Sequence, residues 1–174
     1  QPLDEEYEGG YTGSDFVGLG DWSDTRLLLF GDHDVSVLPP LSASGEDLNM
    51  GAADTLANFI EFGLSNYPAE RNALIFWDHG AGWPGMGPDE FAGGNLVEDT
   101  LDLSEIRTGI VSGLSRVAAE RLDLVGFDAC LMATYEVAAA ITGLADYLLA
   151  SEELEPGHGW DSNALAVLSR NSDI

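Results

Sequence analysis

Two residues of this 174-residue chain have the side chains of a nucleophile and a proton carrier. Cys130 is its single cysteine, and His79 is one of three histidines. A thiolate can attack a carbonyl carbon, and an imidazole can move the protons that acyl transfer requires. Gly80 follows the histidine, and its N–H, free of a neighbouring Cβ, would form an oxyanion hole with the Cys130 N–H. A buried structural cysteine and a histidine held in a glycine-rich turn are the alternative interpretations.

Neighbouring strands of a parallel sheet are expected to bring these residues together. Residues 73–77 and 122–127 are short apolar runs, typical of buried strands, and His79 and Cys130 follow them closely. The carboxyl ends of parallel strands meet at one edge of the sheet, where α/β proteins bind their ligands. Cys130 also precedes a predicted helix over residues 131–142, whose dipole would lower the pKa of the thiol.

The remaining patterns predict a regular alternation of strands and helices. Residues 80–100 contain six glycines and two prolines, which predicts a long loop. Such an alternation indicates an α/β fold with a mostly parallel sheet covered on both faces. We expect further strands at 26–30 and 147–151, helices along Ala53, Leu56, Ile60 and Leu64 and along Ile106, Ile110, Leu114 and Val117, a capping box at Asp102 and Glu105, and a short helix at 164–168.

Composition excludes several classes of protein. The chain has 31 acidic residues, six arginines and no lysine, a net charge of −25, which excludes the nucleic-acid backbone as a partner. Its apolar stretches are too short to cross a bilayer, so we expect no membrane insertion. Apolar residues make up 45% of the chain and argue against global disorder. A single cysteine excludes an internal disulfide framework and a multi-cysteine zinc site.

Five short motifs between residues 49 and 160 together resemble the clostripain family of cysteine peptidases, and the similarity covers roughly residues 25–168. They are Asn49–Gly51, Asn66–Ala69, Trp77–Trp83, Phe127–Met132 and Ser151–Trp160. The resemblance implies a caspase-like, three-layer αβα fold, with His79 as the catalytic histidine and Cys130 as the nucleophile. It also implies cleavage of peptides or proteins after Arg or Lys, with calcium dependence and self-processing in some members. No basic residue lies between His79 and residue 103, so self-processing in that loop is not expected.

Specificity is expected to come from acidic residues beside the nucleophile. The resemblance implies that Asp128 lines the pocket for the basic side chain, whereas capping of the following helix is its alternative role. Glu152 and Glu153 follow the neighbouring strand and would close the same pocket, or are exposed loop residues. An aspartate or glutamate at the pocket floor would favour Arg over Lys, because a guanidinium forms bidentate pairs.

No cofactor is required for this chemistry, and calcium stays an open question. The acidic surplus provides oxygen ligands, but their spacing matches no EF-hand loop, and a solvated acidic surface is the simpler interpretation. We therefore assign no metal site. The candidate calcium ligands are Asp32, Asp34, Glu98, Asp99 and Asp102.

The chain is expected to contain two segments, a loop or disordered segment and an incomplete catalytic core. Residues 1–24 are acidic and glycine-rich, which predicts a loop or disordered segment. Residues 25–174 are expected to form a peptidase catalytic core that is incomplete at both ends, as part of a longer protein. No signal peptide opens the chain. A secreted or cell-surface location is expected from the family resemblance alone.

The sequence thus favours a cysteine endopeptidase that uses a Cys130–His79 dyad. Two alternatives stay open: a catalytically inactive, caspase-like acidic module that binds calcium or mediates adhesion, and a different thiol hydrolase acting on amides or esters. The intact His79–Gly80 and Cys130 motifs favour the enzyme, because an inactive module has no need to keep both.

Overall fold

The computed structural model describes residues 25–31, 34–41, 48–89 and 99–160. The chain divides into two compact units, residues 1–48 and 49–174. The predicted acidic segment 1–24 and the predicted helix at 164–168 lie outside the described residues.

The first unit contains a small antiparallel hairpin. Strand β1 (Leu28–Phe30) pairs with β2 (Val35–Val37), with Leu29 opposite Ser36. The prediction of a buried strand over residues 26–30 is wrong in its burial, because the Phe30 side chain is 62% exposed. An apolar run of this length fits an edge hairpin as well as a core strand, and periodicity alone does not separate the two.

The second unit contains a parallel sheet of three strands in the order β3-β6-β7. These strands are β3 (Ala73–Trp77), β6 (Leu122–Asp128) and β7 (Ala145–Leu149). The apolar runs predict β3 and β6 closely, whereas β7 begins two residues before the predicted strand. The sequence prediction of an α/β fold with a mostly parallel sheet is confirmed.

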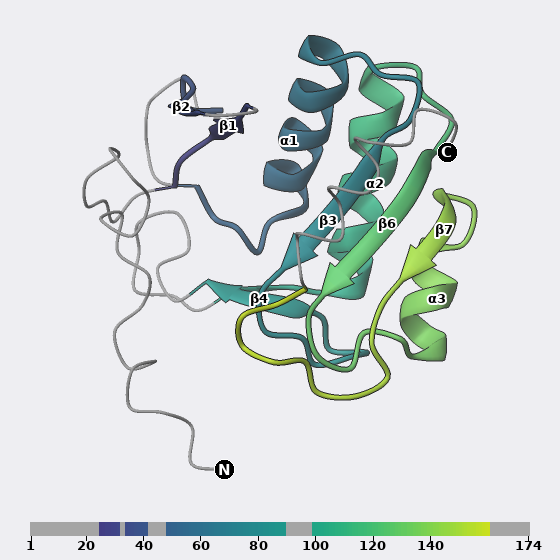
Figure 1. Ribbon diagram of the computed structural model, residues 1–174. Helices are drawn as coiled ribbons and strands as arrows, with labels where there is room; N and C mark the ends of the chain where they lie inside the picture. The colour runs from purple at the N-terminus through teal and green to yellow at the C-terminus, as the bar shows by residue number, and fades with distance from the viewer. Residues whose placement is uncertain (1–24, 32–33, 42–47, 90–98, 161–174) are drawn as a thin grey trace. The chain divides into compact units, whose positions relative to one another are not determined.

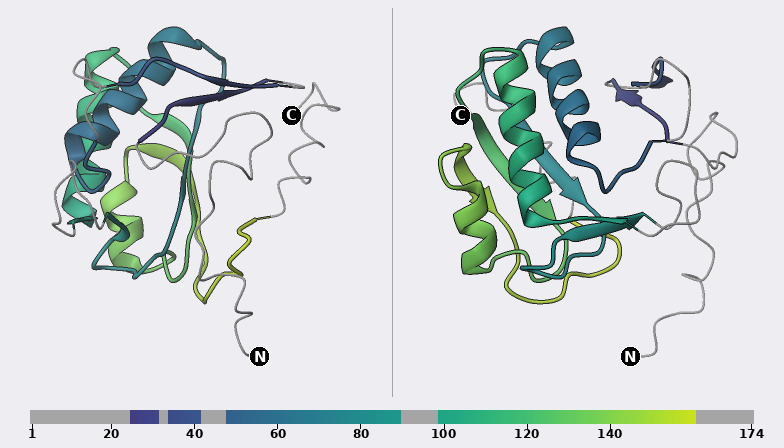
Figure 2. Two further views of the ribbon diagram at one scale, coloured as in Figure 1. Left: turned by 90° about the vertical axis from the view of Figure 1, so that its left-hand side faces the viewer. Right: turned by 180° about the vertical axis from the view of Figure 1, so that it is seen from behind.

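Three helices lie on the same face of this sheet: α1 (Ala53–Asn66), α2 (Leu103–Arg116) and α3 (Tyr135–Ile141). Figure 1 shows them behind the strands, and the left view of Figure 2 shows them on one side of the sheet. Phe76 and Phe127 stack at 5.0 Å between ring centroids in the core below them. In the described part of the chain, the opposite face carries exposed apolar side chains: Ile75, Trp77, Tyr147 and Leu149.

Glycines allow α1 and α2 to pack closely. A Cβ placed on Gly113 would lie 2.7 Å from the Ile60 Cβ, and one on Gly109 would lie 2.8 Å from the Ala53 carbonyl oxygen. The start of α2 carries the predicted capping box. Asp102 accepts a hydrogen bond from the Glu105 N–H, and the Glu105 carboxylate accepts one from the Asp102 N–H.

The predicted loop over residues 80–100 contains a second hairpin instead. Strand β4 (Met86–Asp89) pairs antiparallel with β5 (Asp99–Leu101), with a register shift between Met86 and Pro88. Gly87 and Pro88 conceal β4 in the sequence, because both residue types are typical of turns. Residues 90–98 lie outside the described residues.

Candidate active site

The parallel pairing of β3 and β6 brings the carboxyl ends of the two strands together, and His79 and Cys130 follow these ends. Trp77 is the register partner of Asp128, and both candidate residues lie two positions further along their chains. Adjacent strands are about 4.8 Å apart, so neighbouring residues just beyond their ends share one small region. His79 is exposed and Cys130 is partly buried, so both are accessible to a ligand.

The turns that follow the two strands are in direct contact. A Cβ on Gly80 would collide with the Cys130 carbonyl oxygen and would lie 3.0 Å from the Ala129 Cβ. Gly82 has a φ of +73°, and a Cβ there would lie 3.2 Å from the Leu131 carbonyl oxygen. Glycine at both positions therefore allows the histidine turn to lie against the cysteine turn.

Hydrogen bonds to main-chain and side-chain oxygens hold the histidine turn. The His79 N–H donates to Asp78 Oδ1 at 2.5 Å, and the His79 carbonyl accepts from the Gly87 N–H at 3.0 Å. Ala81 donates to the Gly85 carbonyl at 3.0 Å, which closes the turn before β4. The β4 hairpin, missed by the sequence analysis, thus supports the position of the histidine.

The predicted helix start at Leu131, directly after Cys130, is wrong. Helix α3 begins at Tyr135, and the Thr134 hydroxyl caps it by accepting a hydrogen bond from the Val137 N–H. Leu131 has a φ of +63°, a left-handed conformation that interrupts any continuous helix from Cys130. Cys130 therefore does not begin this helix, and Thr134, not Asp128, caps it.

The loop that follows β7 lies along the cysteine turn (the 151–160 loop). The Leu131 N–H donates to the Glu153 carbonyl at 3.1 Å, and the Ala133 N–H donates to the Ser151 carbonyl at 2.9 Å. The Glu155 N–H donates to Cys130 Sγ at 3.2 Å. Sequence patterns carry no signal for Glu155, because its contact uses the main chain and not the side chain.

Asp128 lies at the end of β6 with one carboxylate oxygen unpaired. Oδ2 accepts a hydrogen bond from the Trp160 N–H at 2.9 Å, whereas Oδ1 is buried and lacks a hydrogen-bond partner among the described residues. Gly159 has a φ of +70°, and a Cβ there would lie 2.8 Å from the Trp77 indole nitrogen. Glycine at this position lets the 151–160 loop cover the aspartate.

The two predicted glutamates lie in the same loop. Glu152 and Glu153 are exposed, and Glu153 contacts the cysteine turn through its carbonyl oxygen. Their part in a substrate pocket stays a prediction.

The predicted calcium ligands are spread over several elements. Asp99 accepts a hydrogen bond from the Asn49 amide at 2.6 Å, and Asp102 caps α2. Residues 25–31, 34–41, 48–89 and 99–160 contain no group of three or more acidic, histidine or cysteine side chains that could hold a metal ion. Asp32 and Glu98 lie outside the described residues.

A sequence model described as the clostripain family matches residues 30–174 of this chain. The chain belongs to the clostripain family. Clostripain of Hathewaya histolytica is 33% identical to it over 147 residues, which cover 72% of this chain and 26% of clostripain. The chain therefore spans about a quarter of the length of this curated relative.

Solved structures of clostripain-family proteases share the fold. A secreted cysteine protease from Bacteroides thetaiotaomicron, in complex with an irreversible peptide inhibitor, is 26% identical with a TM-score of 0.60 and covers 77% of this chain and 36% of its own. An inactive zymogen from Parabacteroides distasonis is 25% identical with a TM-score of 0.53 and covers 78% and 36%. The described residues of the present chain contain no helix long and apolar enough to cross a membrane.

Proposed function

We propose that this chain carries the catalytic centre of a cysteine endopeptidase, with Cys130 as nucleophile and His79 as the general acid–base. The observation that carries the proposal is the contact between the two post-strand turns, where the Gly80 main chain lies against the Cys130 carbonyl. Membership of the clostripain family and the likeness to structures of cysteine proteases support the same chemistry.

Acylation begins when the Cys130 thiolate attacks the carbonyl carbon of the scissile peptide bond. A C–S bond forms, and the carbonyl oxygen becomes an oxyanion within reach of the Gly80 and Cys130 N–H groups. Collapse of this intermediate breaks the C–N bond. The His79 imidazolium gives its proton to the leaving amine, so the first product departs as a neutral amine.

Deacylation releases the second product. His79, now neutral, takes a proton from a water molecule as that water attacks the thioester carbonyl carbon. The C–S bond then breaks, which returns the thiolate and the imidazolium and releases the new carboxylic acid, which ionises in water.

We further propose that Asp128 receives the guanidinium of an Arg residue at the cleaved bond. Its Oδ1 is a buried carboxylate oxygen that has no hydrogen-bond partner among the described residues, and such an atom is costly unless a donor reaches it. The four arginines of residues 49–89 and 99–160 bond elsewhere: Arg71 to Asp123, Arg107 to the end of α3, Arg116 to α1 and Arg121 to Asp146. None of these four arginines would therefore compete with a substrate cation for Asp128.

The finer parts of this proposal concern the pocket, the ion and the location. Glu152 and Glu153 would add negative charge to the rim of the Arg pocket, and the net charge of −25 would attract basic peptides. The chemistry requires no calcium, and any calcium binding is expected to add little to stability beyond general screening of charge. A secreted or cell-surface location is supported by the description of the Bacteroides relative as secreted.

Substitution of the dyad in the intact protein tests this function. Cys130→Ala should abolish hydrolysis of an Arg-containing peptide, because the nucleophile is lost. His79→Ala should reduce kcat/KM by at least ~100-fold, the scale of a lost general acid–base. His158→Ala is the matched control, since His158 lies in the 151–160 loop with its ring against the Gly159 carbonyl and should lose far less.

Retained hydrolysis in Cys130→Ala would overturn the assignment. Alkylation of Cys130 no faster than that of a free peptide thiol, together with absent hydrolysis, would instead favour the inactive acidic module. Cleavage of esters or non-peptide amides without cleavage of peptides would favour a different thiol hydrolase.

A further inference from the structure

A short turn that precedes α1 is hydrogen-bonded to both strands of the β4–β5 hairpin. The Asn49 side-chain amide donates to Asp99 Oδ2 on β5 at 2.6 Å. The Met50 N–H donates to Asp89 Oδ2 on β4 at 2.8 Å. In Figure 1 the chain that enters α1 passes beside this hairpin. The turn formed by residues 49–51 (the Asn49 turn) therefore connects the two strands of the hairpin to the start of α1.

The Asn49 turn provides a donor to each of two opposed carboxylates. Asp89 is the register partner of Asp99 in the antiparallel pair, and like charges opposite each other destabilise such a pair. Asn49 Oδ1 accepts a hydrogen bond from the Gly51 N–H at 2.8 Å, so both ends of this side-chain amide are bonded. A Cβ on Gly51 would lie 3.0 Å from the Asp99 Cβ, so glycine lets the turn lie directly against β5.

The other end of the hairpin holds the histidine turn. The Gly87 N–H donates to the His79 carbonyl at 3.0 Å, and Gly80 forms an antiparallel bridge with Met86. Met86 and its register partner Leu101 are both buried in the core. A displacement of the hairpin would therefore carry His79 and Gly80 with it.

We propose that Asn49 is a positioning residue, whose side-chain amide fixes the β4–β5 hairpin and, through the hairpin, the place of His79 and Gly80 relative to Cys130. This rests on the proposed function in taking His79 as the general acid–base. The proposed Arg pocket at Asp128 is formed by β6 and the 151–160 loop instead. Loss of the Asn49 contact should therefore reduce kcat and change KM little.

Asn49→Asp tests the proposal, because it replaces the donor by a carboxylate that faces Asp99. In the intact protein, kcat for an Arg-containing peptide should fall by about 10-fold or more, since a displacement of about 1 Å can cost ~10²-fold in rate. Adding Asp99→Asn supplies the amide from the opposite strand and forms the same hydrogen bond in the reverse direction. This second substitution should restore most of kcat.

Two alanine variants separate the positioning role from the loss of any asparagine. Asn49→Ala removes the donor without adding a charge, and it covers the case in which Asn49→Asp does not fold. Asn66→Ala is the matched control, since the Asn66 amide donates to the Phe62 carbonyl at 2.8 Å at the far end of α1. Asn49→Ala should lower kcat several-fold, and Asn66→Ala should leave it nearly unchanged. Full kcat in a folded Asn49→Asp variant, no recovery on adding Asp99→Asn, or equal losses in the two alanine variants would overturn the proposal.

Amide hydrogen exchange reports on the histidine turn without any substrate. The Gly87 N–H should exchange faster in Asn49→Asp or Asn49→Ala than in the unsubstituted protein, and Asp99→Asn should slow it again in the Asn49→Asp background. The Leu122 N–H, hydrogen-bonded at the amino end of β6, should keep its rate in every variant. Equal acceleration at both amides would indicate general destabilisation and refute the positioning role. Hydrolysis that survives in Cys130→Ala would end the proposed function but leave the exchange result standing.

Discussion

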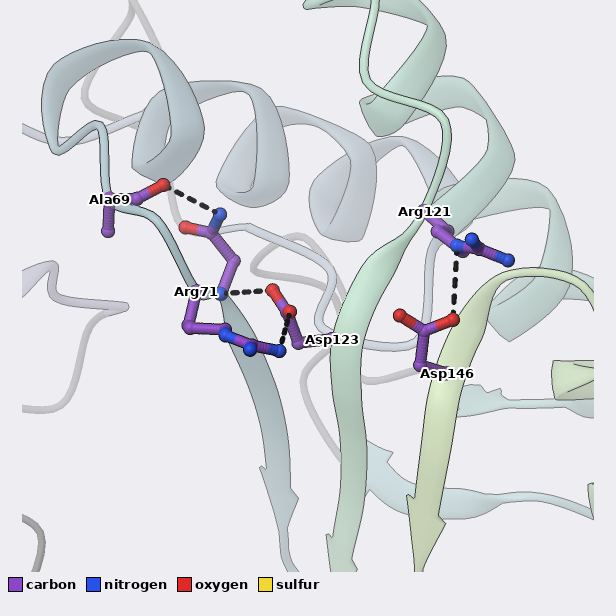
Figure 3. A network of polar contacts seen from close by, with 6 residues as sticks. Ala69, Arg71, Arg121, Asp123 and Asp146 are labelled. Atoms are coloured by element: carbon purple, nitrogen blue, oxygen red, sulfur yellow. Dashed lines mark hydrogen bonds and ion pairs between the residues drawn. The ribbon is translucent and has the colours of Figure 1, made fainter. Parts of the chain in front are cut away.

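Acidic residues at the two ends of the three-stranded sheet differ in their hydrogen-bond and ion-pair partners. At the amino end, Asp123 accepts from the Asn72 N–H at 2.7 Å and pairs with Arg71 at 3.1 Å, and Asp146 pairs with Arg121 at 3.1 Å (Figure 3). At the carboxyl end, Asp128 has main-chain donation to one oxygen and no hydrogen-bond partner, among the described residues, for the other. Arginines pair with the acidic residues at the amino end, whereas at the carboxyl end one buried oxygen of Asp128 lacks a hydrogen-bond partner among the described residues.

The pKa of Asp123 reflects its hydrogen bonds at the amino end of the sheet. The Asn72 N–H, followed by the Arg71 guanidinium, holds the pKa of this carboxyl below its ordinary value of 3.8, although partial burial acts in the opposite direction. A carboxylate stabilised in this way contributes to folding, whereas a buried carboxylate oxygen without a hydrogen-bond donor costs stability.

The largest expected effect that separates the two ends is on substrate turnover. Asp128→Asn should reduce kcat/KM for an Arg substrate by about 100-fold or more, because a buried charged partner of the guanidinium is lost. Asp123→Asn is the matched control at the other end of the same strand and should leave kcat/KM nearly unchanged. Equal losses in both variants would mean that Asp128 is structural, and the contrast between the two ends would fail.

A second prediction concerns the contact between the two post-strand turns. Gly80→Ala places a Cβ against the Cys130 carbonyl and should reduce kcat by about 10²–10³-fold, the scale of a lost oxyanion-hole donor. Gly63→Ala is the matched control, since a Cβ in this position of α1 would meet nothing within 4 Å. It should stabilise the fold by about 0.5–1 kcal/mol in chemical unfolding. Full activity in Gly80→Ala would contradict the placement of the turn.

Particular residues show how far the sequence predicts this arrangement. The apolar runs predict β3 and β6, and the predicted parallel sheet aligns the carboxyl ends of these strands, which His79 and Cys130 follow. The capping box of Asp102 and Glu105 is also predicted, because residues three positions apart in the sequence form it. Local patterns are therefore sufficient for the strands that precede the two candidate catalytic residues.

The parts missed by the sequence depend on contacts between distant segments. Leu131 has a left-handed backbone conformation, which residues with a large side chain rarely adopt. The residue type therefore does not predict that the helix is interrupted here. The 151–160 loop meets the cysteine turn through main-chain groups, which every residue carries. β4 contains Gly87 and Pro88, both typical of loops, and only its pairing with β5 makes it a strand.

A third, smaller effect concerns the pH dependence of stability. Because the folded pKa of Asp123 is lowered, its contribution is present above about pH 4 and is lost as pH falls through the folded pKa. Thermal melts should therefore show a lower Tm for Asp123→Asn than for the unsubstituted protein at pH 7, with the difference shrinking toward pH 3. A difference that grows on acidification would contradict the assigned sign.

The smallest expected effect separates general charge repulsion from a calcium site. The screening length falls from about 8 Å at 0.15 M salt to about 3 Å at 1 M, so sodium chloride should raise the Tm of a chain with net charge −25. Millimolar calcium should add little beyond its ionic strength. An increase of several degrees with calcium alone would favour a specific site, with the Asp32–Asp34 and Glu98–Asp102 segments as the first to substitute.

The most direct test of the central claim is a structure of the intact protein with an irreversible peptide inhibitor that carries Arg at its reactive end. The account predicts a covalent bond from Cys130 Sγ to the inhibitor. It also predicts an ion pair, with a guanidinium nitrogen of the inhibitor's Arg within about 4 Å of Asp128 Oδ1. The His79 imidazole should lie beside the inhibitor carbon that is bonded to Cys130 Sγ. A bond to Cys130 with the guanidinium in solvent would remove Asp128 from specificity, and an unmodified Cys130 in an active protein would contradict the account as a whole.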